Sequence, residues 1–233
     1  MANAKFWCLT VKLRSDKREL SRRVKFNYAL PILLLTTTLQ VCAGGLESLE
    51  SFLKTAHSGR ATFSQVVTPP VKAGQTAKSK ASSGVFAFIR PTRFRFDYQK
   101  PYPLTLVADG TMLWWYDVDL AQVTARSQTQ ALSSSPAALI ATASDLATLQ
   151  KEFHLQDQSE ADAVQWVQAT PKREGALQSI RLGFADGVLK VLEMTDNFAQ
   201  RSVLSFSTME LNPKLGADTF VFTPPKGADV VRP

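Results

Sequence analysis

The chain has 233 residues and a formal net charge of +7, because 27 lysines and arginines outnumber 20 aspartates and glutamates. The excess is confined to residues 1–43, which carry eight basic and two acidic side chains and leave 19 basic and 18 acidic residues for the remainder. Both cysteines, Cys8 and Cys42, lie in the same segment, so the composition of the rest excludes a basic DNA-binding domain, a disulfide framework and a cysteine-ligated zinc or iron–sulfur site.

Residues 1–43 have the three parts of a secretory signal peptide. The basic stretch is followed by an apolar run over residues 29–41 and then by small residues. Pro31 and three threonines interrupt this run, and it is too short for a membrane-spanning helix of ~20 apolar residues. We therefore expect cleavage after Ala43, or after Gly44, and export of the remaining chain.

Two alternatives for this segment stay open. Leu39 lies three residues before Cys42, as in lipoprotein signals, so Cys42 could instead carry a lipid. Val41 is bulky where such signals place a small residue, and lipidation is therefore the less favoured interpretation. Translation could also begin nearer Val24, because the basic stretch is long for a signal peptide.

The mature chain shows no charge tract, internal repeat or second linker, which predicts a single domain over residues 44–233. Apolar residues at helical spacing predict a helix over residues 46–56, which ends at Ser58-Gly59. Residues 61–67 predict a strand, and residues 68–83 a polar loop.

From Gly84 onward, short apolar runs alternate with turn residues, the pattern of an antiparallel β meander. Asp109-Gly110 and Asp186-Gly187 lie between such runs and predict tight hairpin turns. Two helices interrupt the strands, one over residues 135–142 with a serine cap and a proline at its first position, the other over residues 145–153. The predicted strands are 85–89, 93–98, 104–107, 112–117, 122–126, 164–169, 179–184, 188–194, 201–209 and 219–222.

Segment 84–98 makes one face of the predicted sheet strongly aromatic. Successive side chains of a strand point to opposite faces, so Arg93 and Arg95 take the other, largely solvated face. Two strands later, Leu113-Trp-Trp-Tyr116 adds further aromatic bulk. The aromatic residues that share one parity are Phe86, Phe88, Phe94, Phe96 and Tyr98.

These aromatic residues could simply fill the core of a β protein, since large apolar side chains are usually buried. Two observations weaken that interpretation: few helices are predicted for so wide an apolar face, and Arg90 has the same parity as the phenylalanines. A guanidinium that points into an apolar interior is costly unless its donors are satisfied. Alternatively, a bend at Pro91 turns Arg90 to the rim of the sheet and exposes it.

A series of motifs resembles a known family. They are Arg90-Pro91, Phe94-Arg-Phe96, Val107-Ala-Asp-Gly110, Leu113-Trp-Trp-Tyr-Asp117, Ser135-Pro-Ala-Ala-Leu139 and Phe220-Val-Phe-Thr-Pro-Pro-Lys-Gly227. In these motifs, in their order and in its export signal, the chain resembles the periplasmic outer-membrane lipoprotein carrier proteins of the LolA family. The resemblance extends from the first mature helix to about Val231. The segment 68–83 departs from it, because it is longer than expected and carries lysines.

The resemblance implies a mainly β fold with a few helices. This is an incomplete antiparallel β-barrel, or half-barrel, closed by a helical lid over a hydrophobic cavity. Members of the family take up the acyl chains of lipoproteins released by an ATP-driven inner-membrane transporter. They deliver the lipoproteins to an outer-membrane acceptor. The resemblance therefore implies a monomeric periplasmic carrier, with no nucleic-acid partner and no stable insertion into a membrane.

Particular residues match functional positions of the family. Arg90 matches an arginine that hydrogen-bonds to the lid and holds it closed. Phe94 and Phe96 match positions that line the cavity, and residues 135–142 correspond to a lid helix. The other residues that we expect in the cavity wall are Leu53, Phe86, Phe88, Leu106, Trp114 and Tyr116. The residues that we expect to carry the lid helix are Pro136, Leu139 and Ile140.

The sequence offers little support for catalysis. The only histidines, His57 and His154, have no His or Glu at metal-ligand spacing, and neither a nucleophile elbow nor a glycine-rich phosphate loop occurs. We therefore predict no catalytic residues, no cofactor and no metal. A hydrolase built on His154 is the least favoured alternative. Two others stay open: a lipid-anchored acceptor of the same fold, and a binding protein for small apolar ligands.

Overall fold

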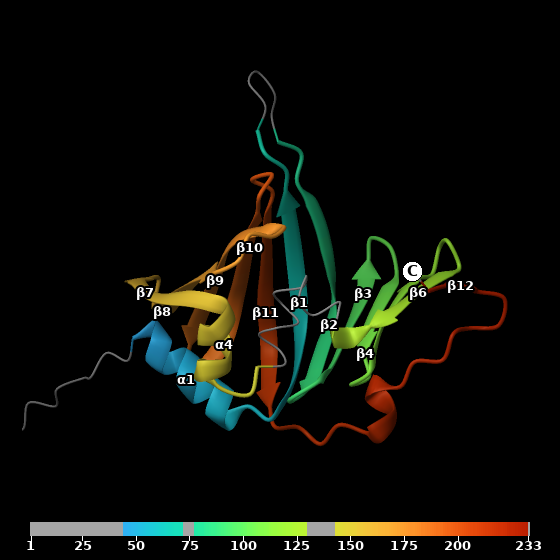
Figure 1. Cartoon of the computed structure of the whole chain (residues 1–233), viewed down its shortest axis with the longest axis horizontal. Coiled ribbons are helices and arrows are strands. Elements are labelled where there is room, and N and C mark those ends of the chain that lie inside the picture. Colours follow the sequence, from blue (N-terminus) through green and yellow to red (C-terminus); the bar gives the residue numbers. More distant parts are fainter. Residues whose placement is uncertain (1–43, 72–76, 130–142, 233) are drawn as a thin grey trace, which may run out of the picture. The chain divides into compact units, whose positions relative to one another are not determined.

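The computed structural model describes residues 44–71, 77–129 and 143–232. Their strands form one 12-stranded sheet in the order β12-β6-β5-β4-β3-β2-β1-β11-β10-β9-β8-β7, which stays open between β12 and β7 (Figure 1). The elements are α1 (Gly45–Thr55), β1 (Ser58–Thr68), β2 (Lys80–Ile89), β3 (Arg93–Lys100), β4 (Leu104–Ala108), β5 (Met112–Asp117), β6 (Gln122–Ser127), α4 (Leu146–Glu152), β7 (Phe153–Ala161), β8 (Val164–Pro171), β9 (Leu177–Ala185), β10 (Val188–Asp196), β11 (Arg201–Leu211), the 3-10 helix η1 (Ala217–Phe220) and β12 (Asp229–Val231). The prediction of a mainly β, unclosed barrel with few helices is confirmed.

The predicted alternation along segment 84–98 is also confirmed. Phe86 lies opposite Phe96, and Phe88 opposite Phe94, so the four rings share one face of the sheet. We call this the inner face, and the face that carries Arg93 and Arg95 the outer face. The four phenylalanines are at most 5% exposed.

Helix α1 lies on the inner face and contacts the strands β7 to β10 (Figure 1). Leu49, Phe52 and Leu53 recur at helical spacing and are at most 2% exposed, and burial of each such side chain is worth roughly 1.5–3 kcal/mol. The helix starts close to β8, since a side chain on Gly45 would lie 2.3 Å from the carbonyl oxygen of Trp166. The Asp157 carboxylate accepts a hydrogen bond from Leu46 N at 2.7 Å and supplies the anion that a helix N-terminus favours.

The outer face is covered by the chain that follows β11. Phe222 packs against Trp114 and Tyr116, with ring centroids 5.5 and 5.9 Å apart. Phe220 is 1% exposed, and Arg93 lies over its ring at 5.8 Å. A second, smaller apolar cluster therefore lies on the side of the sheet opposite the phenylalanine face.

The hairpin turns form where glycines permit them. Gly110 has φ of 106°, and Asp186-Gly187 has φ of 53° and 72°, the positive values that a tight two-residue turn requires. In the first turn the Asp109 carboxylate accepts hydrogen bonds from Thr111 N, Met112 N and Trp114 Nε1, each at 2.8 Å. Partial burial acts to raise the pKa of Asp109, but these hydrogen bonds outweigh it, so the pKa lies below its usual value.

Four predictions of secondary structure need correction or comment. The strand predicted over residues 219–222 is wrong, because the segment forms η1 and an extended stretch. Strands β7 and β12 were not predicted, and β12 pairs with β6 in parallel. The loop predicted over residues 68–83 is too long, since β2 already begins at Lys80 and pairs with Val67. The helix predicted over residues 145–153 is confirmed as α4, whereas residues 135–142 lie outside the described residues.

Within the described ranges, no helix is long and apolar enough to cross a membrane. Helices α1 and α4 contact each other and strands of the sheet, and η1 contacts β3.

The outer cluster predicts a stability difference between neighbouring residues. Phe220→Ala should lower the free energy of unfolding by about 3–5 kcal/mol, because it opens a cavity beneath η1. Val221, which is 60% exposed, is the matched control, and Val221→Ala should change stability by no more than about 0.5 kcal/mol. Urea unfolding of residues 44–233 measures both. Equal effects of the two substitutions would contradict the packing of the C-terminal segment on the sheet.

Candidate functional site: the aromatic inner face and its arginine

The inner face of β1, β2, β3 and β11 is a continuous layer of aromatic rings. Phe86 is at its centre, with ring centroids 4.4 Å from Phe96, 5.7 Å from Phe88 and 5.6 Å from Phe206. Phe63 of β1 packs edge-on against Phe96 at 5.5 Å. Each such pair of rings contributes about 0.5–1.5 kcal/mol of stability beyond the contribution of its buried apolar area. Together the rings form a broad, buried apolar layer without hydrogen-bonding groups.

Leu53 lies on the other half of the inner face, in the buried face of α1 and the same core cluster. In that helix, Phe52 packs against Phe88 at 6.3 Å and Phe184 at 5.7 Å, so α1 joins the aromatic layer to β9. Of the predicted cavity residues, the structure therefore brings together Leu53, Phe86, Phe88, Phe94 and Phe96.

Strand β5 departs from the prediction. Leu106 lies opposite both Phe96 and Trp115, so the inner face continues from β3 through Leu106 to Trp115. Trp114 and Tyr116 therefore point to the outer face, where they contact Phe222. The prediction that Trp114 and Tyr116 line the same face as the phenylalanines is wrong.

Sequence reasoning missed Leu113 and Trp115, which take the inner face of β5 instead. Leu113 lies opposite Ala108 and packs against the core cluster, while Trp115 remains 49% exposed. The signal was available in principle, because only alternate residues of Leu113–Tyr116 can share a face. Choosing the right pair required the register of β4 and β5.

Arg90 follows β2 and lies between α1 and the sheet. Its guanidinium carbon is 5.5 Å from the ring centre of Phe52 and 5.3 Å from that of Phe88, a cation–π arrangement. Burial lowers the pKa of Arg90 to about 10, which leaves the side chain charged at neutral pH. The alternative of an exposed arginine turned outward by Pro91 is thus wrong.

The guanidinium joins two separate segments. Arg90 Nε donates to the carbonyl oxygen of Ala56 at 2.8 Å, and Nη1 donates to that of Ala143. Ala56 caps the C-terminus of α1, where orphan carbonyls and the helix dipole favour a cation. Ala143 is the first described residue after 142 and precedes α4. One side chain therefore fixes the end of α1 to the start of the segment that leads into α4.

Gln128, which no sequence pattern indicated, makes a comparable junction at the end of β6. It is 3% exposed; its Oε1 accepts from Gly110 N at 2.9 Å, and its Nε2 donates to the carbonyl oxygen of Thr92 at 2.5 Å. Thr92 and Arg90 belong to the same turn between β2 and β3. That turn therefore holds the chain both before residue 130 and after residue 142.

The remaining predicted site residues, Pro136, Leu139 and Ile140, lie outside the described residues. His57 and His154 are exposed, on the chain after α1 and on β7. In the part of the chain that the structure describes, no group of three or more His, Cys, Asp or Glu side chains could hold a metal ion.

Comparisons with known proteins match this chain by sequence to one family. Residues 54–223 match a family model described as outer membrane lipoprotein carrier protein LolA. A protein from Albidiferax ferrireducens named outer-membrane lipoprotein carrier protein is 57% identical over 195 residues, 82% of this chain and 92% of its own. One of the same name from Leptothrix cholodnii is 48% identical over 82% of this chain and 86% of its own.

Among solved structures, an uncharacterized conserved protein from Thermus thermophilus matches with a TM-score of 0.50 at 14% identity, over 81% of this chain and 97% of that one. At this identity the match supports the fold alone.

The assignment of the two tryptophans predicts a difference in fluorescence quenching. A brominated fatty acid bound to the inner face should quench Trp115, which is on that face, and leave Trp114 unquenched. Trp114→Phe should therefore keep most of the quenching, and Trp115→Phe should lose most of it. Trp166, the only other tryptophan after residue 43, gives a common background in both variants. The reverse order of quenching would contradict the register of β5.

Proposed function

The chain belongs to the outer membrane lipoprotein carrier protein family, LolA, and we propose that it carries lipoproteins through the periplasm with their acyl chains against the inner face. The observation that supports this most strongly is the continuous aromatic layer around Phe86. An acyl chain in water costs ~0.8 kcal/mol per CH2 group, so a lipoprotein with two or three chains needs a cover worth tens of kcal/mol.

A carrier must also release its cargo. Broad contact with rings tolerates many positions of an acyl chain and presents no deep, closely shaped pocket. The layer extends through Leu106 to Trp115, which is already 49% exposed, and so offers apolar surface at an accessible part of the sheet. This combination suits a ligand that is bound by area and later handed on.

Arg90 is the latch of the empty protein in this proposal. Its bonds to Ala56 and Ala143 join α1 to the chain before α4, and a hydrogen bond with a charged partner is worth about 1.5–3 kcal/mol. A latch of that strength can open without chemical energy of its own. Binding of the lipoprotein competes with the closed state. A latch that stabilises the closed state therefore lowers the affinity for the lipoprotein and favours its delivery. The helix that residues Pro136, Leu139 and Ile140 are expected to form belongs to the segment held in this way.

The partners follow from the same role. An ATP-driven inner-membrane transporter supplies the lipoprotein, and an outer-membrane acceptor receives it from the carrier, which acts as a monomer. The nearly even balance of charge after residue 43 suits a protein that meets two membranes without adhering to their anionic lipids.

Export requires removal of residues 1–43 as a signal peptide. Gly44 lies beside the Asp157 carboxylate, so a new amino terminus at Gly44 gains an anionic neighbour. The intact mass of protein purified from cells should begin at Gly44, or at Gly45. A mass that retains Cys42 with a bound lipid would contradict this and favour a lipid-anchored acceptor of the same fold.

The carrier role is tested with inner-membrane vesicles that hold the transporter and a radiolabelled lipoprotein. Residues 44–233 should bring the lipoprotein into solution and pass it to outer membranes. Arg90→Leu should still accept the lipoprotein but deliver it roughly tenfold more slowly or worse, because loss of the latch lets the cargo stay bound.

Arg93→Leu is the matched control, since Arg93 lies on the outer face over Phe220 and should leave both steps unchanged. If the unmodified protein fails to solubilise any lipoprotein, the carrier function is wrong. If Arg90→Leu delivers normally, only the latch role is wrong.

A further inference from the structure

The inner face changes from aromatic to polar along a diagonal that crosses four neighbouring strands. Toward the hairpin between β1 and β2, each of these strands carries an inward-facing polar residue beyond its last phenylalanine or leucine, and Val67 of β1 follows Gln65 on the same face. These residues, which we call the polar row, are Tyr98 on β3, Ser82 on β2, Gln65 on β1 and Ser202 on β11. Each is half-buried, whereas Phe63, Phe96 and Leu204, two residues further in, are at most 5% exposed.

Hydrogen bonds connect three members of the polar row. Tyr98 Oη donates to Gln65 Oε1 at 2.9 Å, and Gln65 Nε2 donates to Ser202 Oγ at 2.8 Å. Among the described residues, these bonds leave the second N–H of Gln65 and the hydroxyl hydrogen of Ser202 available. Burial raises the pKa of Tyr98, so its hydroxyl stays protonated and keeps Gln65 oriented as a donor. The row therefore presents donors at the end of an apolar layer.

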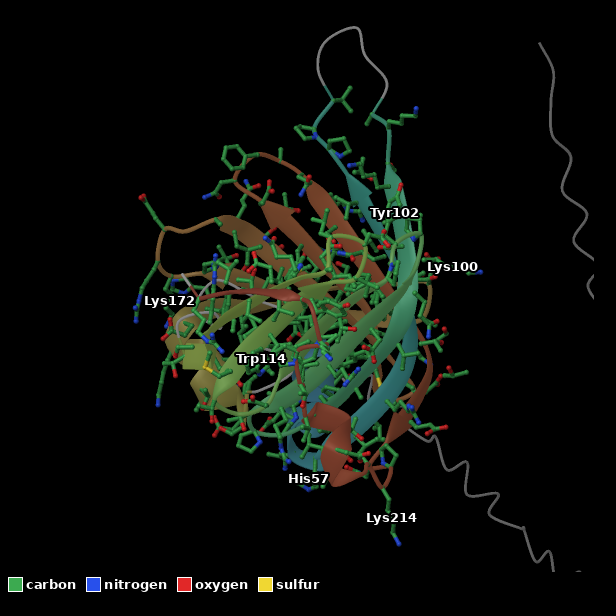
Figure 2. All side chains as sticks on the ribbon, turned by 90° about the vertical axis from the view of Figure 1, so that its right-hand side faces the viewer. His57, Lys100, Tyr102, Trp114, Lys172 and Lys214 are labelled. Carbon is green, nitrogen blue, oxygen red and sulfur yellow. The ribbon has the colours of Figure 1, made fainter. Side chains whose placement is uncertain are left out.

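Charged groups follow the polar row toward the rim. Lys80 and Lys100 lie beyond Ser82 and Tyr98 on the same strands, and both are exposed. Figure 2 shows Lys100 and Tyr102 at this end of the sheet and His57 at the opposite end. Along β2, the inner face thus passes from aromatic rings to a neutral donor and then to a cation.

A lipid has its groups in the same order. Acyl chains are apolar, the ester or amide group that begins each chain has a carbonyl oxygen that accepts a hydrogen bond, and a polar head follows. We propose that the polar row binds the carbonyl oxygens of ester- or amide-linked acyl chains of a diacylglyceryl ligand, with Gln65 and Ser202 as donors and Tyr98 as a positioning residue. The inference rests on the proposed carrier function and adds the part of the lipid that the inner face recognises.

The test compares ester with ether ligands, because an ether-linked chain has no carbonyl oxygen. The probes are a cysteine peptide with an S-diacylglyceryl group of two hexadecanoyl esters and its counterpart with two hexadecyl ethers. Displacement of a fluorescent fatty acid measures both dissociation constants. The unmodified protein should prefer the ester by roughly three- to tenfold, the effect of one or two hydrogen bonds.

Gln65→Met removes the donors with little change in volume and should bring the ester-to-ether preference close to one by weakening ester binding alone. Ser202→Ala should reduce it in part, and serves as a second variant with a smaller packing change. Thr62→Val is the matched control: Thr62 bridges the same strands on the outer face, with Oγ1 2.8 Å from Ser207 Oγ, and should keep the full preference.

A glycerophospholipid with the same esters distinguishes the source of the ligand. If Gln65→Met removes the preference for the ester with both the peptide and the phospholipid, the polar row binds diacylglyceryl groups in general. If Gln65→Met removes that preference with the peptide alone, the polar row binds lipoproteins. The inference is overturned if the unmodified protein shows no preference for the ester, or if Gln65→Met weakens ester and ether binding equally. The carrier function would still stand in either case if the protein solubilises lipoprotein. Failure to bind either peptide contradicts both.

Discussion

A sheet face lined with phenylalanines must be covered in water, and the packing of the inner side of the sheet serves to cover it. Around Phe86 the rings cover one another, with centroids 4.4–5.7 Å apart. Over β7 to β10 the cover is α1, which buries Leu49, Phe52 and Leu53. The outer face is closed separately by the C-terminal segment through Phe220 and Phe222, so its packing does not depend on what occupies the inner face.

The turn between β2 and β3 bonds to the chain on both sides of residues 130–142. Arg90 binds Ala143 after residue 142, and Thr92 binds Gln128 before residue 130. Gln128 is deeply buried and also accepts a hydrogen bond from Gly110. Arg90 is half-buried, and its charged guanidinium donates to Ala56 and Ala143 and lies beside the rings of Phe52 and Phe88.

Much of the inner face could be predicted because segment 84–98 fixes its own parity. Five aromatic residues alternate with charged or small ones on two successive strands, and no other arrangement buries them together. Strand β5 gave no such guide, since Leu113, Trp114, Trp115 and Tyr116 are all apolar or aromatic. Their faces depend on pairing with β4 and on the C-terminal segment, which covers Trp114 and Tyr116 from a distant part of the chain.

Other features depend on contacts that are remote in sequence. Arg90 is stabilised by carbonyl oxygens 34 and 53 residues away, and backbone acceptors have no sequence signature. The segment before Phe222 has the composition of a strand but forms η1, since it packs over Arg93 and Arg95 and does not pair. The polar row joins residues 33 and 137 positions apart, and its side chains are common at any strand end.

The central claim, that the inner face holds the acyl chains, can be measured with a photocrosslinking residue at two neighbouring positions of β11. Phe206 faces Phe86 on the inner face, and Ser205 is exposed on the outer face. p-Benzoylphenylalanine in place of Phe206 should crosslink to lipoprotein in intact cells, and the same residue in place of Ser205 should not. Crosslinking of lipoprotein from position 205 and not from position 206 would contradict the account.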